Sequence, residues 1–130
     1  MSRTILVTLV LLLLPVVVHA QDPALTDSSK YTVVLENERV RVLEYRDHPG
    51  EKTTRHAHPD FVLHALSDFR RRLTFLDGST AVRDFKAGDV VFMKAQTHIG
   101  QNVGQTDTHV MIVELREPAP PPTAPPVKPN

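Results

Sequence analysis

The 130-residue chain contains no cysteine, so neither a disulfide framework nor a lipid-modified cysteine can stabilise or anchor it. Its 15 basic residues balance its 15 acidic residues, and a net charge of +0 leaves no excess of positive charge to hold a phosphate backbone. No stretch has the period of a long amphipathic helix, and no Gly-rich phosphate loop or GxSxG turn is present. These absences argue against a nucleic-acid partner, a phosphate-loop protein and a serine hydrolase.

The composition is that of one folded domain. Hydrophobic residues make up 41% of the chain and charged residues 23%, which is the ordinary range for globular proteins. A chain of this length has room for one core, since two separate cores would each be too small. Packing must therefore hold the fold.

The N-terminal segment has the pattern of a secretion signal. Residues 5–18 form an apolar run after the positive charge of Arg3, and small residues precede the expected cleavage site after Ala20. A membrane anchor is the alternative, but about 14 apolar residues fall short of the ~20 that a spanning helix needs, and Pro15 interrupts them. We predict that residues 1–20 are a signal peptide and that the mature protein is periplasmic or secreted, without stable membrane insertion.

Proline dominates the C-terminal end. Residues 118–130 read PAPPPTAPPVKPN, and proline removes backbone donors and favours an extended, solvated conformation. We predict a disordered tail or spacer there, with a docking segment for a partner as the alternative. The folded domain is predicted to span residues 30–117.

Short β-branched runs fill the region between these ends. They are separated by Gly, Pro, Asn and Asp, and Asp77-Gly78 is a strong tight-hairpin dipeptide. Strands this short must bury one face against another sheet, so the pattern predicts an all-β sandwich or barrel. The expected strands are Thr32–Leu35, Val40–Tyr45, Thr53–His58, Phe61–Leu66, Arg71–Leu76, Ala81–Phe85, Val90–Met93, His98–Val103 and Thr108–Leu115.

Two histidines lie two residues apart on one predicted strand. His56 and His58 therefore leave the same face of the pleat, about 6.6 Å apart along the chain. Two imidazoles in this arrangement can converge on one ion, given nitrogen–metal bonds of about 2.0–2.1 Å for zinc. The pair alone is weak evidence, because such pairs also occur on exposed strands.

The residues around this pair form a longer pattern. Gly50 precedes His56-Ala57-His58 with the spacing G-x5-H-x-H, and Gly88 opens a second segment that contains His98 and Asn102. Together these segments resemble the two signature motifs of the cupin family, G-x5-H-x-H-x3,4-E-x6-G and G-x5-P-x-G-x2-H-x3-N. The resemblance covers most of the folded domain. It implies a small single-domain cupin with a double-stranded β-helix, or jelly-roll, barrel, and a metal site at His56, His58 and His98.

The sequence also departs from the family pattern. The glutamate of the first motif would fall at Val62 or Leu63, so that ligand is missing, and Lys94 and Gln96 stand where the second motif has proline and glycine. The resemblance therefore implies a site of three histidines with open positions. Neutral imidazoles suit Fe2+ or Zn2+, which we favour, ahead of Ni2+, Cu2+ or Mn2+.

Three further polar residues are candidates for lining the site or contacting its ligands. His64 could replace the glutamate as a ligand, line the pocket or pack in the core. His109 alternates with Met111, Val113 and Leu115, which predicts that it points inward to the core or the pocket. Asn102 belongs to the second motif. The basic run at residues 70–72 is interpreted as one or two solvated positions on the outer face of a strand.

The resemblance names a site without naming a reaction. An oxygenase-type or isomerase-type enzyme that acts on a small molecule is the first hypothesis. The alternatives are a non-catalytic module that binds a metal or small ligand, and a barrel whose histidines bind nothing. No residue near the motifs stands out as a general base. The expected partners are a small-molecule ligand and, for the assembly, a second copy in a homodimer.

Overall fold

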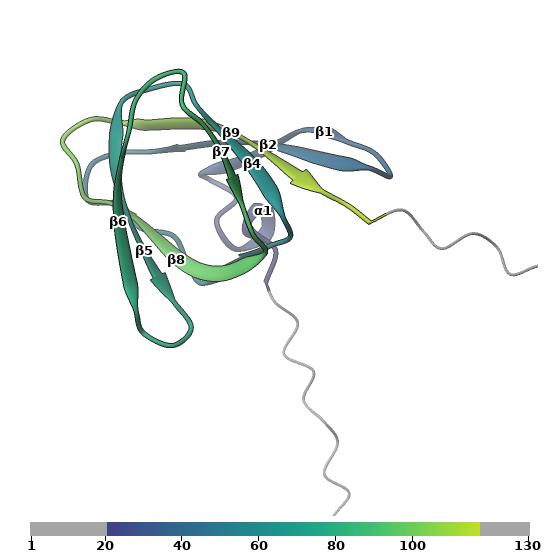
Figure 1. Cartoon of the computed structure of the whole chain (residues 1–130), viewed down its shortest axis with the longest axis horizontal. Coiled ribbons are helices and arrows are strands. Elements are labelled where there is room, and N and C mark those ends of the chain that lie inside the picture. Colours follow the sequence, from purple (N-terminus) through teal and green to yellow (C-terminus); the bar gives the residue numbers. More distant parts are fainter. Residues whose placement is uncertain (1–20, 118–130) are drawn as a thin grey trace, which may run out of the picture.

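A computed structural model describes residues 21–117 of the chain (Figure 1). The predicted signal peptide at 1–20 and the predicted proline-rich tail at 118–130 lie outside the described residues. Among the residues described, no helix is both long and apolar enough to cross a membrane.

Two antiparallel sheets build the domain, and the predicted all-β jelly-roll fold is confirmed. The five-stranded sheet has the order β1-β2-β9-β4-β7, with β1 at Tyr31–Glu36, β2 at Val40–Asp47, β9 at Thr108–Leu115, β4 at Phe61–Ala65 and β7 at Val90–Met93. The four-stranded sheet has the order β3-β8-β5-β6, with β3 at His56–His58, β8 at Gln96–Asn102, β5 at Phe69–Phe75 and β6 at Thr80–Phe85. In Figure 1 the strands of both sheets curve around a common interior.

Turn residues account for the hairpin between β5 and β6. Gly78 has a φ of +82°, a backbone conformation that residues with a Cβ atom rarely adopt. The carboxylate of Asp77 accepts a hydrogen bond from the Ser79 backbone N–H at 2.9 Å. The Asp77-Gly78 dipeptide thus forms the tight turn that its sequence predicts.

A short helix that sequence analysis did not predict precedes the barrel. This helix, α1, spans Pro23–Thr26, and the Asp22 side chain caps it by accepting a hydrogen bond from the Ala24 N–H at 2.9 Å. The Asp22 carboxylate also receives two hydrogen bonds from Arg41 on β2, at 2.6 and 3.0 Å. The segment before Lys30 is therefore attached to the barrel by a bidentate ion pair.

The core lies between the two sheets. Buried side chains come from the inner faces of both: Tyr31, Leu43, Tyr45, Phe61, Leu63, Ala65, Phe69, Phe85, Val110 and Ile112. On β9 the buried set is Thr108, Val110, Ile112 and Glu114, so the alternate set that begins with His109 faces outward. The prediction that His109 points inward is wrong. Its Nε2 lies 2.8 Å from Glu44 Oε1 on the outer face instead.

Candidate metal centre

Backbone pairing brings the three predicted ligand histidines together. β3 pairs with β8 so that His56 lies opposite His98, and His58 follows His56 on the same inner face. The ring centroids are 4.9 Å apart for His56 and His58, 4.8 Å for His56 and His98, and 5.5 Å for His58 and His98. All three are buried, and one ring nitrogen from each lies within 4.8 Å of the others.

The hydrogen bonds of His56 leave its Nε2 as an acceptor. Its Nδ1 lies 2.8 Å from the carbonyl oxygen of Thr54, which can only accept, so the Nδ1 carries the proton. The Nε2 lies 3.2 Å from the Tyr31 hydroxyl, which is the donor in that contact. A partner that fixes the Nδ1 proton is the usual device for presenting Nε2 to a metal.

His58 is held in the same tautomer by a carboxylate. Its Nδ1 donates to Glu114 Oε1 at 2.6 Å, and the other oxygen of Glu114 accepts from Arg41 Nε at 2.7 Å. Burial alone would raise the pKa of Glu114, but the hydrogen bonds from His58 and Arg41 outweigh it and hold that pKa below its ordinary value. An ionised Glu114 thus orients His58 and increases the basicity of its Nε2. Sequence reasoning did not identify Glu114.

His98 has a buried nitrogen without a hydrogen-bond partner. Within residues 21–117, its Nδ1 is the one fully buried side-chain nitrogen or oxygen that lacks a partner. Burial lowers the pKa of His98 to about 2, with a further contribution from His56 and His58, and burial lowers that of His56 to about 4. Both rings are therefore neutral near pH 7, which is the form that binds a metal.

The donor set fits a divalent transition metal. Three imidazoles suit iron, zinc, nickel or copper. Three nitrogens that bind one ion tetrahedrally at about 2.0–2.1 Å lie ~3.4 Å from one another. The three ligand nitrogens lie within 4.8 Å of one another, so binding an ion would draw them together by up to about 1.4 Å.

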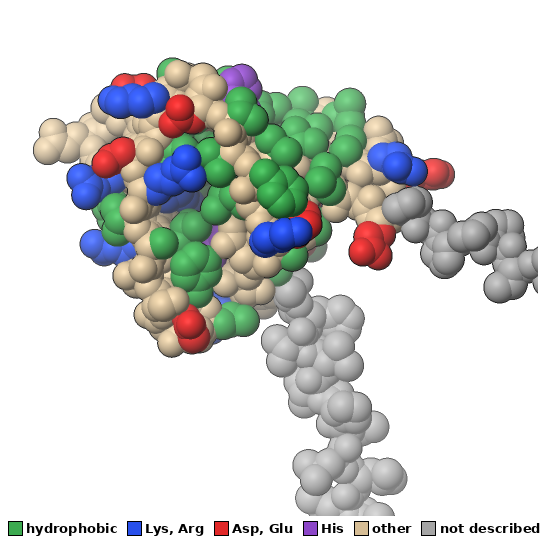
Figure 2. Space-filling view, viewed as in Figure 1, with side chains coloured by type: hydrophobic (Ala, Val, Ile, Leu, Met, Phe, Trp, Pro, Cys, Tyr) green, Lys and Arg blue, Asp and Glu red, His purple; other side chains and the backbone are tan. Residues whose placement is uncertain are grey.

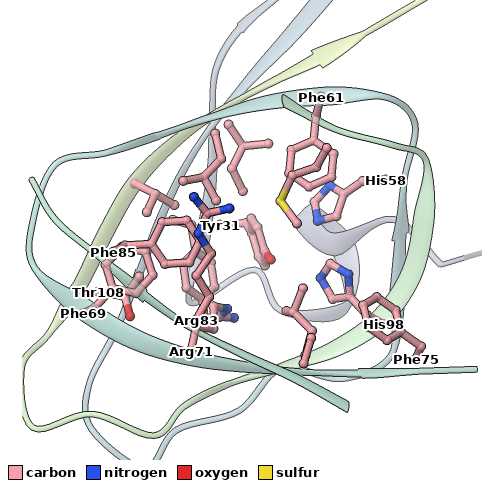
Figure 3. Close-up of a pocket in the computed structure, with 17 residues that line it drawn as sticks. Tyr31, His58, Phe61, Phe69, Arg71, Phe75, Arg83, Phe85, His98 and Thr108 are labelled. Carbon is pink, nitrogen blue, oxygen red and sulfur yellow. The ribbon is translucent and has the colours of Figure 1, made fainter. Parts of the chain in front are cut away.

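A cavity of about 250 Å³ adjoins the histidines (Figure 3). That is room for more than water, whose share of the liquid is about 30 Å³ per molecule. His58 and His98 line one part of the cavity. Most of the remaining wall is aromatic or aliphatic and includes Phe61, Phe69, Phe75, Phe85, Met93 and Ile112.

Arg71 also lines this cavity, whereas Arg70 and Arg72 are exposed, as the interpretation of the basic run expects for one or two of its positions. Arg71 Nη1 donates to Asp47 Oδ2 at 2.9 Å, its Nη2 donates to the Tyr45 hydroxyl at 3.0 Å, and its guanidinium lies 4.6 Å from the centre of the Tyr45 ring. The alternation of Phe69, Arg71 and Leu73 along β5 is the signal that could have placed it inside.

The other sequence candidates lie away from the histidine cluster. His64 is exposed, because β4 turns Leu63 inward and therefore turns its neighbour outward. The expectation that His64 lines the pocket is wrong. Asn102 is buried, but its side-chain amide donates to Thr106 O at 2.8 Å and Thr108 Oγ1 at 3.2 Å, so it supports a loop. Asn102 does not line the cavity.

No family model and no curated protein matches the sequence, but solved structures do. A cupin domain from Bordetella pertussis Tohama I matches with a TM-score of 0.61 and 26% identity, over 67% of this chain and 92% of that chain. The chain has the cupin fold. An uncharacterized conserved protein with a double-stranded β-helix domain from Klebsiella pneumoniae subsp. pneumoniae MGH 78578 matches with 28% identity and a TM-score of 0.51, over 67% and 83% of the two chains.

A polyketide cyclase from Streptomyces resistomycificus has the same fold as this protein, with a TM-score of 0.52 over 69% of this chain and 66% of that one. At 16% identity the likeness concerns the fold alone. The cupin motif glutamate has no counterpart on β4, where Val62 faces outward and Leu63 lines the cavity with an apolar side chain. Among the described residues, the group of potential ligands in this chain is three histidines.

Proposed function

We propose that this protein binds one divalent transition metal at His56, His58 and His98 and acts on a small molecule held in the adjoining cavity. The observation that carries the proposal is the set of three buried imidazoles, of which His56 and His58 have their Nδ1 protons fixed by Thr54 and Glu114. Fe2+ and Zn2+ suit this donor set, with Ni2+, Cu2+ and Mn2+ behind them.

The reaction class that we propose is an oxygenation or an isomerisation. A metal at this site would supply a Lewis acid, and iron would add redox chemistry. The chain itself supplies an apolar cavity wall that excludes water. It also supplies the Tyr31 hydroxyl group, which lies 3.2 Å from His56 Nε2. Burial raises the pKa of Tyr31 above its ordinary value, so the hydroxyl keeps its proton and serves as a hydrogen-bond donor near the histidines.

Metal analysis tests this proposal. Purified protein should contain close to one transition-metal ion per chain, and His56→Ala, His58→Ala and His98→Ala should each lose most of it. His64→Ala is the matched control, since His64 is exposed on the neighbouring sheet and should not affect the metal content. A wild-type protein that takes up none of iron, zinc, nickel, copper or manganese after reconstitution would contradict the proposal.

A non-catalytic binding module is the second candidate. One observation favours this candidate: Glu114, which contacts His58, uses one carboxylate oxygen for His58 and the other for Arg41. Neither oxygen of Glu114 is therefore free to act as a base. Turnover of a bound small molecule by the metal-loaded protein would support the enzyme hypothesis over the binding module. Tight binding without turnover would decide for the module.

Export and self-association complete the proposal. We retain the predicted cleavage after Ala20 and a periplasmic or secreted location, which N-terminal sequencing of the mature protein tests.

We also propose a homodimer whose interface is the outer face of the five-stranded sheet. There Leu35, Val42, Val113, Val62 and Phe92 pair in one register row across all five strands.

This row supports contact with a second copy of the chain. Figure 2 shows hydrophobic side chains gathered over the region where β1, β4, β7 and β9 are labelled in Figure 1. Exposed apolar patches on soluble proteins often mark interaction sites. Because the chain has a net charge of +0, two copies approach each other without net repulsion.

A further inference from the structure

Two arginines lie directly opposite each other on the inner face of the four-stranded sheet. β5 and β6 pair so that Arg71 lies opposite Arg83. The neighbouring pairs on the same face of the sheet are Phe69 with Phe85 and Leu73 with Ala81. Both arginines line the cavity next to the histidines (Figure 3). Side chains directly opposite in a sheet have Cβ atoms about 4.5–5.5 Å apart, where like charges destabilise the pair.

The two arginines differ in their ion pairs. Arg71 is neutralised by Asp47, which lies 2.9 Å from its Nη1. For Arg83, no carboxylate of residues 21–117 lies within ion-pair distance. Its neighbour Asp84 faces the other side of the strand, where it lies 3.8 Å from Arg70. The cavity wall thus carries one cation in excess.

An apolar surface lies beside this cation. The Arg83 guanidinium lies 4.8 Å from the centre of the Phe85 ring, and Phe85 stacks on Phe69 with centroids 4.7 Å apart and an interplanar angle of 14°. Phe75 and Met93 also line the cavity. A neutral apolar ligand would make no ion pair with Arg83, which is exposed at the cavity, and a strongly polar ligand would leave the aromatic wall without a partner.

We infer that the cavity binds a small carboxylate with an aromatic or aliphatic body, and that Arg83 pairs with the carboxylate. The body packs on Phe85 and Phe69, and the ligand lies between Arg83 and the wall that contains His58 and His98. The inference rests on the proposed function for the role of this ligand as the substrate. The pairing with Arg83 itself requires no metal.

Calorimetric titration with phenylacetate, using 2-phenylethanol as a neutral probe of similar shape, tests the inference. We expect the protein to bind phenylacetate more tightly than the alcohol. Added NaCl should weaken the binding of phenylacetate but not that of the alcohol, because salt screens the exposed Arg83 charge. Arg83→Gln should weaken phenylacetate binding about tenfold, which corresponds to ~1.4 kcal/mol. The alcohol should be affected less than twofold.

Arg72→Gln is the matched control. Arg72 is an exposed arginine on β5 that alternates with Arg71 and does not line the cavity, so the variant should bind both probes as the wild type does. If Arg83→Gln binds phenylacetate as tightly as the wild type, or if the wild type does not prefer phenylacetate to the alcohol, the inference is wrong.

A parallel titration separates this inference from the metal proposal. Each protein is titrated as purified and after treatment with a chelator, and its metal content is measured. Phenylacetate binding that survives metal removal but is weakened by Arg83→Gln supports the inference even if the wild type contains no metal. Binding that disappears with the metal and is insensitive to Arg83→Gln would overturn it while leaving the metal proposal intact.

Discussion

Glu114 shows how one residue connects the histidine cluster to the rest of the barrel. It lies at the inner face of β9, where it accepts from His58 Nδ1 on one oxygen and from Arg41 on the other. Arg41 in turn binds Asp22, so a chain of charge-assisted hydrogen bonds runs from the site to the N-terminal helix. The orientation of His58 therefore depends on residues that do not contact the cavity.

We predict that Glu114→Gln lowers metal affinity by about 10–100-fold, the usual effect of removing the partner of a ligand histidine. The neutral amide retains the shape of the side chain but cannot stabilise the His58 ring as a carboxylate does. Competition with a chromogenic chelator measures the affinity. Glu44→Gln is the control, because Glu44 contacts His109 on the outer face and should leave the metal affinity unchanged. Equal affinities for Glu114→Gln and the wild type would contradict the role of Glu114.

At the scale of elements, the short helix α1 depends on the barrel for its position. Four residues are too few for a helix to be stable by itself. The helix is held by the Asp22 cap, by the Asp22–Arg41 ion pair and by the hydrogen bond from the Ala57 N–H to the Gln21 carbonyl at 3.1 Å. The last contact attaches the segment to β3, which carries two of the three histidines.

We predict that Asp22→Asn lowers the free energy of unfolding by about 1 kcal/mol at pH 7. This is less than the ~1.5–3 kcal/mol of a buried charged hydrogen bond, because Asp22 is about a third exposed and solvent screens the pair. Asparagine still caps the helix, so the substitution tests the charge.

The same variant should show a defined pH dependence. Hydrogen bonding to Arg41 lowers the pKa of Asp22 below its ordinary 3.8, so the ion pair stabilises the fold above that pH. The stabilisation is lost as the pH falls through the lower folded-state pKa, and the difference between variant and wild type should shrink. Urea unfolding at pH 7 and pH 3 measures this. Asp84→Asn, in a surface pair, should change stability by less than ~0.5 kcal/mol at both values. A difference that grows in acid would refute the assignment.

At the scale of the whole molecule, the proposed function assigns a role to two surfaces of the barrel. The interior holds the histidines and the cavity, and the outer face of the five-stranded sheet presents the apolar row from Leu35 to Phe92. Phe92 is 52% exposed, although its apolar strand suggests a core residue. An isologous dimer would cover the same row on both copies.

We predict that Phe92→Lys converts the proposed dimer into a monomer, because a charge within an apolar contact between two copies would have to be desolvated. Sedimentation equilibrium measures the mass. Leu76→Lys is the control, since Leu76 is 65% exposed in the β5–β6 hairpin, outside the row, and should leave the mass unchanged. A wild-type protein that is monomeric at high concentration would disprove the dimer.

Local sequence determined the strands and part of the site. Short β-branched runs between turn residues located all nine strands of the described chain, since both periodicity and turn chemistry are local properties. The spacing of His56 and His58 placed both rings on one face for the same reason.

Tertiary structure decided which face of each strand is inside. On β9 both alternate sets contain apolar residues, Val110 and Ile112 on one side and Met111 and Val113 on the other, so alternation could not assign His109. Shifting the inward set by one residue exchanges every side chain between core and solvent. The same ambiguity prevented the sequence from placing Arg71 inside the barrel and His64 outside it. Glu114 reaches His58 across 56 positions of sequence, a contact that exists only once the two sheets have closed.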